Sequence, residues 1–112
     1  MPAGEPIKSR LAGHPRLSHV VRSFALQLPT KLRAMDAALL QHDLAELAAL
    51  AHWLKGAGGT VGYDAFFEPA RDFEQQAKDD DVAAMQASLQ QLHGMAARLV
   101  VPAAPEAEAA TA

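Results

Sequence analysis

The segment around His52 carries the strongest chemical signal in this sequence of 112 residues. On a helix that turns about 100° per residue, Leu50 and Leu54 lie opposite His52, so its imidazole is expected to face solvent. The neighbouring positions on this outer face hold small residues, where an exposed helix normally carries long polar side chains. They are Ala45, Ala48, Ala49, Gly56 and Gly59, and we call them the small-residue strip. Lys55, one turn after His52, is the only long side chain beside it.

This strip indicates that another molecule approaches the helix closely. A glycine such as Gly56 destabilises a helix by about 1 kcal/mol relative to alanine, and close contact with a partner would compensate for that loss. We therefore predict Ala48, Ala49, Gly56 and Gly59 as partner-docking positions.

The chemistry open to His52 is limited by its neighbours in the sequence. No Asp or Glu within one helical turn can orient it as in a catalytic triad, and no second histidine or carboxylate at i+3 or i+4 completes a metal site. A neutral imidazole is nevertheless a good nucleophile toward phosphorus. Lys55 would offset the charge of a phosphoryl group on the ring. Because the sequence has neither a phosphate-binding glycine loop nor an evident acidic pocket for Mg²⁺, we expect a partner to supply the metal.

Four stretches of apolar residues at helical spacing must position this face. Ala and Leu dominate a composition that is 50% hydrophobic, which favours helices over strands. Short connections favour antiparallel neighbours. We therefore predict an all-α fold, an antiparallel up-down four-helix bundle over residues 17–101, with a short N-terminal arm (1–16) and a disordered C-terminal tail (102–112). The four stretches cover residues 17–39, 47–61, 63–77 and 82–99.

Prolines and aspartates should set the local course of these helices. Pro29 should kink or restart the first helix, and Pro69 should remove a hydrogen bond from the third and make its first turns irregular. Asp43 and Asp64 are candidate N-caps of the second and third helices, and Asp79-Asp80-Asp81 is read as a cap of the fourth instead of a Mg²⁺ cluster. The second helix should lose its regular structure at the glycines that follow its buried stripe.

The buried residues of that stripe are predicted to be Leu47, Leu50, Leu54, Ala57 and Val61. The aromatic residues Phe66, Phe67 and Phe73 are predicted to lie in the core, and Trp53 is predicted to pack at the edge of the bundle.

Composition and charge exclude several classes of function. Ten Lys and Arg against thirteen Asp and Glu give a net charge of −3, which argues against nucleic-acid binding. The chain has no Cys, so a disulfide framework and a zinc-thiolate site are excluded. No apolar run approaches the roughly 20 residues of a membrane span, and the N-terminus does not resemble a secretory signal. We expect a cytoplasmic monomer that binds neither nucleic acid nor membrane.

Residues 51–62 read AHWLKGAGGTVG and resemble the signature of histidine-containing phosphotransfer (HPt) domains of bacterial phosphorelays, A-H-x-L-K-G-[ASG]-[ASG]-G-x-x-G. The similarity includes Phe24, Leu28-Pro29 and Leu32 upstream and Phe73-Glu74 downstream, so that it spans about residues 17–99. Trp53 occupies a variable position of the signature, and Pro69 departs from the family pattern within the third helix.

The resemblance implies an antiparallel four-helix bundle whose histidine exchanges a phosphoryl group with aspartates of receiver domains. His52 would be the phosphoacceptor, Lys55 its charge partner, and Gly56 and Gly59 would give clearance for the receiver's active site. The implied partners are receiver domains of a hybrid sensor kinase or of response regulators. Mg²⁺ is expected in the receiver, and no cofactor is expected on this chain. Met1 favours a free-standing protein, and a terminal piece of a hybrid kinase is the alternative.

Two other classes of function are weighed against phosphotransfer. The first is a binding-only helical module that docks a receiver without exchanging phosphate. The second is a metal- or cofactor-holding bundle, which is disfavoured because the helix interiors lack an inward carboxylate-histidine set. His14, His19, His42 and His93 are read as solvated or capping residues, and a metal pair of His42 with Glu46 is considered weak.

Overall fold

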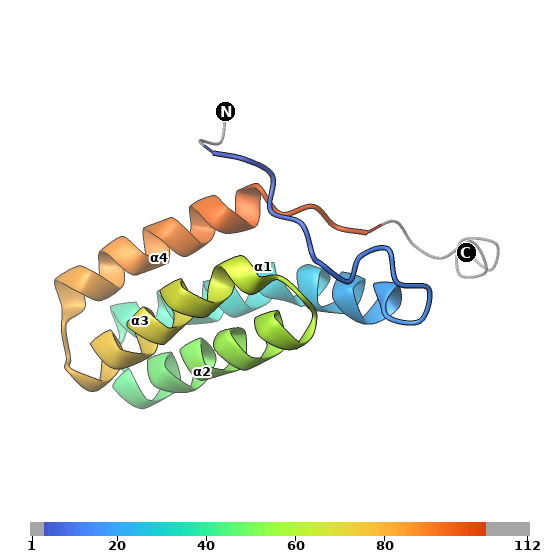
Figure 1. Cartoon of the computed structure of the whole chain (residues 1–112). Coiled ribbons are helices and arrows are strands. Elements are labelled where there is room, and N and C mark those ends of the chain that lie inside the picture. The colour runs from blue at the N-terminus through green and yellow to red at the C-terminus, as the bar shows by residue number, and fades with distance from the viewer. Residues whose placement is uncertain (1–3, 103–112) are drawn as a thin grey trace.

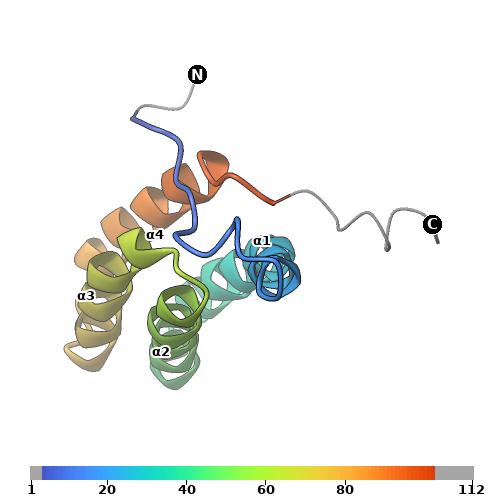
Figure 2. The same cartoon turned by 45° about the vertical axis from the view of Figure 1, so that its right-hand side comes forward.

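The computed structural model describes residues 4–102, in which four α-helices form the predicted up-down bundle. Helix α2 packs against α1 and α3, and α4 also packs against α1 and α3, so the helices surround one core (Figure 1 and Figure 2). The all-α antiparallel fold is therefore confirmed, whereas the predicted disorder of the tail falls, from residue 103 on, outside the described residues. The helices are α1 (Ser18–Leu40), α2 (Leu44–Thr60), α3 (Phe67–Lys78) and α4 (Val82–Ala97), with a 3₁₀ turn, η1 (Asp64–Phe66), before α3.

The core is filled by aromatic and aliphatic side chains from all four helices. Phe66 and Phe73 are fully buried, as predicted, but Phe67 is 45% exposed and the prediction that it lies in the core is wrong. On a helix Phe67 points about 100° away from Phe66, and with Phe66 fully buried this direction turns the Phe67 ring toward solvent. The guanidinium of Arg71 lies 6.0 Å from the centre of the Phe67 ring instead. The largest fully buried side chains are Tyr63, Phe66, Phe73, Leu28, Leu32, Met35, Leu47, Leu54, Met85, Leu92 and Val21.

Helices α1 and α2 are more regular than predicted. Helix α1 continues unbroken through Pro29, so it does not restart there. Its buried residues on both sides of the proline, among them Leu28 and Leu32, anchor the two halves in the same core. Helix α2 remains helical through its glycines and ends at Thr60, because Gly58 is buried against Phe24 and Phe66. Of the predicted buried stripe of α2, only Ala57 is partly exposed.

The α1–α2 and α3–α4 turns share one geometry. In each turn an aspartate is the N-cap: Asp43 accepts a hydrogen bond from the backbone N–H of Glu46, and Asp81 accepts one from Ala84. The residue before each cap has a positive φ, 55° at His42 and 52° at Asp80. His42 Nε2 lies 2.6 Å from Asp80 Oδ1 and links the two turns at one end of the bundle. The reading of this acidic run as a cap is confirmed at Asp81.

The start of α3 corrects two predictions. Asp64 lies in η1 and caps no helix, because its carboxylate accepts hydrogen bonds from the Arg10 guanidinium at 2.8 and 3.2 Å. Pro69 is the third residue of α3, where backbone N–H groups have no intrahelical partner, so the proline removes no hydrogen bond from the helix. The predicted irregularity is confirmed, since η1 is a tighter turn than α3.

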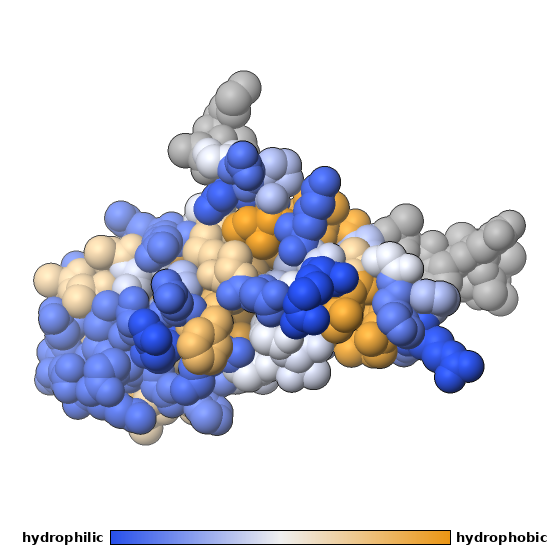
Figure 3. Space-filling model, in the orientation of Figure 1, coloured by the Kyte–Doolittle hydropathy of each residue, from blue (hydrophilic) through white to orange (hydrophobic). Residues whose placement is uncertain are grey.

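The N-terminal arm crosses the opposite end of the bundle and fills it. Ile7 and Ser9 are buried there, and the Ala12 N–H donates a hydrogen bond to Ser9 O, which closes a turn over residues 9–12. The Ile7 N–H donates to Arg98 O and the Val100 N–H donates to Ile7 O, both at 2.8 Å, so the arm pairs with the chain that leaves α4. Hydrophobic surface gathers toward this end in Figure 3, where Val100 and Val101 remain exposed.

Candidate functional site

His52 lies in the middle of α2 and faces outward, as the sequence predicts. Its side chain is 70% exposed, whereas Leu50, Ala51 and Leu54 on the same helix are buried. The exposure follows from the amphipathic pattern, because α2 must bury its leucines against the other helices and thereby turns the imidazole to solvent.

The small-residue strip around His52 is open. A Cβ atom added at Gly56 or Gly59 would meet no heavy atom within 4 Å. Ala49 is also exposed, and Ala48 is partly exposed. Gly58 differs, because an added Cβ there would lie 3.5 Å from Phe66 Cβ. The glycines of α2 therefore divide into one that packs against the core and two that leave space outside the helix.

Glu74 on α3 is a site residue that the sequence analysis did not predict. Its Oε2 lies 3.1 Å from His52 Nδ1, and its Oε1 accepts a hydrogen bond of 2.8 Å from Lys55 Nζ. The absence of a carboxylate within one turn of His52 is thus compensated from the neighbouring helix. One sequence signal could have pointed to Glu74. It follows the core residue Phe73, which places it at the edge of the buried face of a helix that packs on α2.

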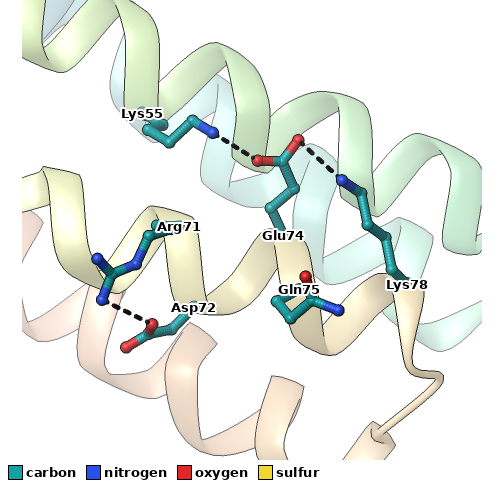
Figure 4. A pocket seen from close by; sticks show the side chains of 6 residues that line it. All are labelled: Lys55, Arg71, Asp72, Glu74, Gln75 and Lys78. Carbon is teal, nitrogen blue, oxygen red and sulfur yellow. Dashed lines mark hydrogen bonds and ion pairs between the residues drawn. The ribbon is translucent and has the colours of Figure 1, made fainter.

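Glu74 stands between two lysines, one from α2 and one from its own helix (Figure 4). Lys78 Nζ lies 3.9 Å from Glu74 Oε2, and the Glu74 side chain is only 13% exposed. The hydrogen bond from Lys55 is the main reason that the pKa of the Glu74 carboxyl is lowered from its ordinary value of 4.5. Glu74 is therefore ionised at neutral pH and can only accept hydrogen bonds.

The Glu74 carboxylate fixes the proton of the neutral His52 ring. An ionised carboxylate requires a donor, so Nδ1 carries the hydrogen in the contact with Glu74. The lone pair is then on Nε2, which has no hydrogen-bond partner among residues 4–102. In this tautomer the distal nitrogen of the imidazole is available as a nucleophile or base.

Trp53 borders the site on the side of α1. Its ring stacks on Phe24 with centroids 5.3 Å apart, and Lys31 Nζ lies 4.9 Å from its centre. Packing at the bundle edge is therefore confirmed. Trp53 also lines a groove between α1 and α2, together with Ala57 and Thr60.

The other histidines occupy different settings. His42 pairs with Asp80, and not with Glu46, and His93 Nε2 lies 3.0 Å from both carboxylate oxygens of Asp36. His14 Nδ1 accepts a hydrogen bond from the Arg16 N–H. Within the described residues no group of three or more His, Asp or Glu side chains is arranged to hold a metal ion. None of the described helices has both the length and the apolar character that a bilayer crossing requires.

Comparison with known proteins identifies the family of this chain. No match was found among curated proteins or among solved structures. The family model described as "Hpt domain" matches residues 19–101, which include all of α2, α3 and α4 and nearly all of α1. An outward histidine on a four-helix bundle is the arrangement that the resemblance of residues 51–62 implies. The chain belongs to the Hpt domain family, whose members act in the phosphotransfer relays of two-component systems.

Proposed function

We propose that His52 accepts a phosphoryl group from the aspartate of one receiver domain and passes it to the aspartate of another. The observation that carries this proposal is the contact of His52 Nδ1 with Glu74, which leaves Nε2 available on an open helix face. The relay is proposed to operate in the cytoplasm.

The proposed step is a transfer between oxygen and nitrogen. The lone pair of His52 Nε2 attacks the phosphorus of the aspartyl phosphate, a bond forms between nitrogen and phosphorus, and the bond from phosphorus to the aspartate oxygen breaks. Its electron pair returns to the receiver's carboxylate. The Nδ1 proton remains in the hydrogen bond with Glu74, whose negative charge stabilises the positive ring formed in the step. Transfer to the second receiver is the same step in reverse.

Lys55 has two roles in this proposal. In the unphosphorylated protein it holds Glu74 through a 2.8 Å hydrogen bond. After transfer, the ammonium group of Lys55 lies one turn from a phosphoryl group that is close to dianionic. Lys55 can then release the Glu74 carboxylate and donate its hydrogen bond to the phosphoryl group instead. Mg²⁺ is proposed to be held by the receiver, where it neutralises charge on the transferring phosphoryl group.

The open strip is proposed as the docking surface for the receiver. Gly56 and Gly59 leave no side chain between the α2 backbone and solvent, and Ala48 and Ala49 add only methyl groups. The reacting nitrogen and phosphorus must come within about 3.5 Å, so bulk beside His52 would separate them.

Radiolabelled transfer tests this proposal. A receiver domain labelled on its aspartate with acetyl [³²P]phosphate and Mg²⁺ is mixed with the protein, and acid-labile, base-stable label is expected on the wild type. His52→Gln should abolish the label, while His93→Gln, which changes another exposed helical histidine, should retain it. Label retained by His52→Gln would refute the assignment. A receiver that binds the wild type without labelling it would favour the binding-only module.

A further inference from the structure

Phe67, the first residue of α3, exposes an aromatic ring that the bundle does not use. Among residues 4–102 it is the only large apolar side chain exposed on α2 or α3, and it is 45% exposed. Phe66, directly before it, is fully buried and packs against other aromatic rings. A single exposed apolar side chain is common on protein surfaces, so the position of the ring decides whether it has a function.

Phe67 lies on the same side of α3 as Glu74. The two residues are seven positions apart in one helix, which places them within about 20° around the axis and about 10.5 Å along it. Glu74 contacts His52 and Lys55 of α2 at the outer surface. The Phe67 ring therefore belongs to the surface that carries His52.

Gly59 is the counterpart of Phe67 on α2. It follows His52 by seven positions, and because α2 and α3 are antiparallel, Gly59 and Phe67 both lie toward the connection between the two helices (Figure 1). The residues before them are in contact, since a Cβ added at Gly58 would lie 3.5 Å from Phe66 Cβ. The space outside Gly59 is open. Gly59 and Phe67 thus form a corner between the bare backbone of α2 and an aromatic ring.

Arg71 connects this corner to the reactive site. Its guanidinium lies 6.0 Å from the centre of the Phe67 ring. Arg71 also lines a hollow between α2 and α3 together with Lys55 and Glu74 (Figure 4). We call Gly59, Phe67 and Arg71 the Phe67 corner. A molecule that covers the site can extend onto the Phe67 corner without crossing another helix.

The size of a typical protein interface includes the Phe67 corner. Such an interface buries about 800 Å² on each partner, which corresponds to a disc of about 16 Å radius. A partner that reacts with His52 must bring its phosphorus within about 3.5 Å of the ring. Phe67 lies about 10.5 Å along α3 from Glu74, which contacts His52, so it falls inside a disc centred on that contact.

We propose that Phe67 is the hydrophobic anchor for receiver domains on this bundle. A docked receiver places an apolar side chain, from a loop about 10 Å from its phosphorylatable aspartate, against the Phe67 ring and the backbone of Gly59. The inference rests on the proposed docking of a receiver over His52. One ring framed by charged side chains such as Arg71 and Lys55 resembles the centre and rim of a protein interface, whereas a membrane requires a continuous apolar helix face.

The test measures binding separately from transfer. Trp53 is the single tryptophan of the chain and lies on the α1 side of the site, so its fluorescence reports docking of a tryptophan-free receiver independently of Phe67. The probes are a receiver with an apolar residue in such a loop and the same receiver with that residue changed to serine. The protein variants are Phe67→Ala, Phe67→Leu and, as the control, Leu40→Ala, which removes an exposed apolar side chain at the far end of α1.

Phe67→Ala is expected to bind the apolar receiver about tenfold more weakly than the wild type, with Phe67→Leu between them and Leu40→Ala like the wild type. The serine receiver should bind the wild type about tenfold more weakly and be insensitive to Phe67→Ala, because both changes remove one contact. In label transfer, Phe67→Ala should raise the receiver concentration for half-maximal rate about tenfold and leave the rate at saturation unchanged, since the ring does not touch the reacting atoms.

Equal binding of the two receivers by the wild type would overturn the inference, and this measurement does not depend on the folding of any variant. Equal binding by folded Phe67→Ala and Leu40→Ala would also overturn it. So would a dimer, detected by sedimentation, that Phe67→Ala dissociates without loss of receiver binding, because the ring would then serve self-association. Failure of label transfer with Phe67-dependent binding intact would refute the proposed function alone.

Discussion

His52 and His93 are both exposed histidines on helices, and each meets a carboxylate from a neighbouring helix. They differ in the ring nitrogen that makes the contact. His52 uses Nδ1 toward Glu74, whereas His93 uses Nε2 toward Asp36. The distal nitrogen is therefore available at His52 and already engaged at His93. A contact between an imidazole and a carboxylate is thus not sufficient for a phosphoacceptor. The carboxylate must contact Nδ1, because only then does the distal nitrogen Nε2 remain available to react.

The two carboxylates also differ. Glu74 is 13% exposed and is held by Lys55 and Lys78, while Asp36 is 48% exposed and has no Lys or Arg partner within the described residues. A carboxylate fixed from two sides can hold the imidazole in one orientation, and an exposed one with a single partner holds it less firmly. The difference between the two histidines can be tested by matched substitutions, and the residues around His52 add further tests.

The largest effect is expected from adding bulk and charge beside each histidine. Gly59→Glu should lower the second-order rate of phosphotransfer about a hundredfold, because a carboxylate placed beside His52 blocks the receiver and repels the phosphoryl group. Gly94→Glu, next to His93, also adds a side chain to open space and should leave the rate unchanged. Rates with a labelled receiver and thermal melts of both variants provide the measurement.

Thermal stability should not fall in either variant, since a Cβ at Gly59 or Gly94 meets no neighbour. Unchanged transfer by folded Gly59→Glu would show that the strip is not covered during the reaction.

A smaller effect is expected from the carboxylates. Glu74→Ala should lower the transfer rate about tenfold, equivalent to about 1.4 kcal/mol, because the ring loses both its orientation and the charge that stabilises its positive form. Glu74→Gln should fall between this variant and the wild type, since the amide oxygen still accepts from Nδ1. Asp36→Asn, the matched change at His93, should transfer like the wild type. An equal loss in Glu74→Ala and Asp36→Asn would contradict the comparison.

Glu74 also predicts a pH dependence of stability. Its pKa is lowered in the folded protein, chiefly by the hydrogen bond from Lys55, so its ionised form stabilises the fold. The free energy of unfolding of the wild type should exceed that of Glu74→Gln by a constant amount above the ordinary pKa of 4.5. The excess should shrink as the pH falls from 4.5 through the lowered value. Urea unfolding at several pH values measures it, and an excess that grows toward acid would contradict the assignment.

The smallest effect is expected from the lysines. Lys55→Ala should slow transfer by about threefold to tenfold, because it removes charge stabilisation and leaves the nucleophile in place. Lys78→Ala also removes an ammonium group beside Glu74, but at 3.9 Å and on a 59% exposed side chain, so it should change the rate little. Single-turnover transfer from a labelled receiver separates the two. A larger loss in Lys78→Ala than in Lys55→Ala would contradict the role given to Lys55.

The parts of this structure that depend on local sequence were predictable. The outward position of His52 follows from Leu50 and Leu54, and the cap at Asp43 follows from its place before an apolar stripe. Both features are set by residues within two turns of the helix concerned, so a helical wheel is enough to find them.

The parts that depend on contacts between distant residues were not predictable. Glu74 reaches His52 across 22 residues, and Arg10 draws Asp64 away from a capping role across 54. Helical spacing places a side chain on one face of its helix, but it does not say which residue of the next helix lies opposite. Pro69 was misjudged for a related reason, because the start of α3 was placed too early.

The pairing of the N-terminal arm with the chain that leaves α4 has a consequence for synthesis on the ribosome. Each pair of consecutive helices can dock soon after it emerges, because the turns between them are short. Ile7 is translated among the first residues, yet its hydrogen bonds wait for Arg98 and Val100, and closing so long a loop is entropically unfavourable. The segment made early is therefore the last to find its place, and the nascent bundle stays open at that end until translation has passed α4.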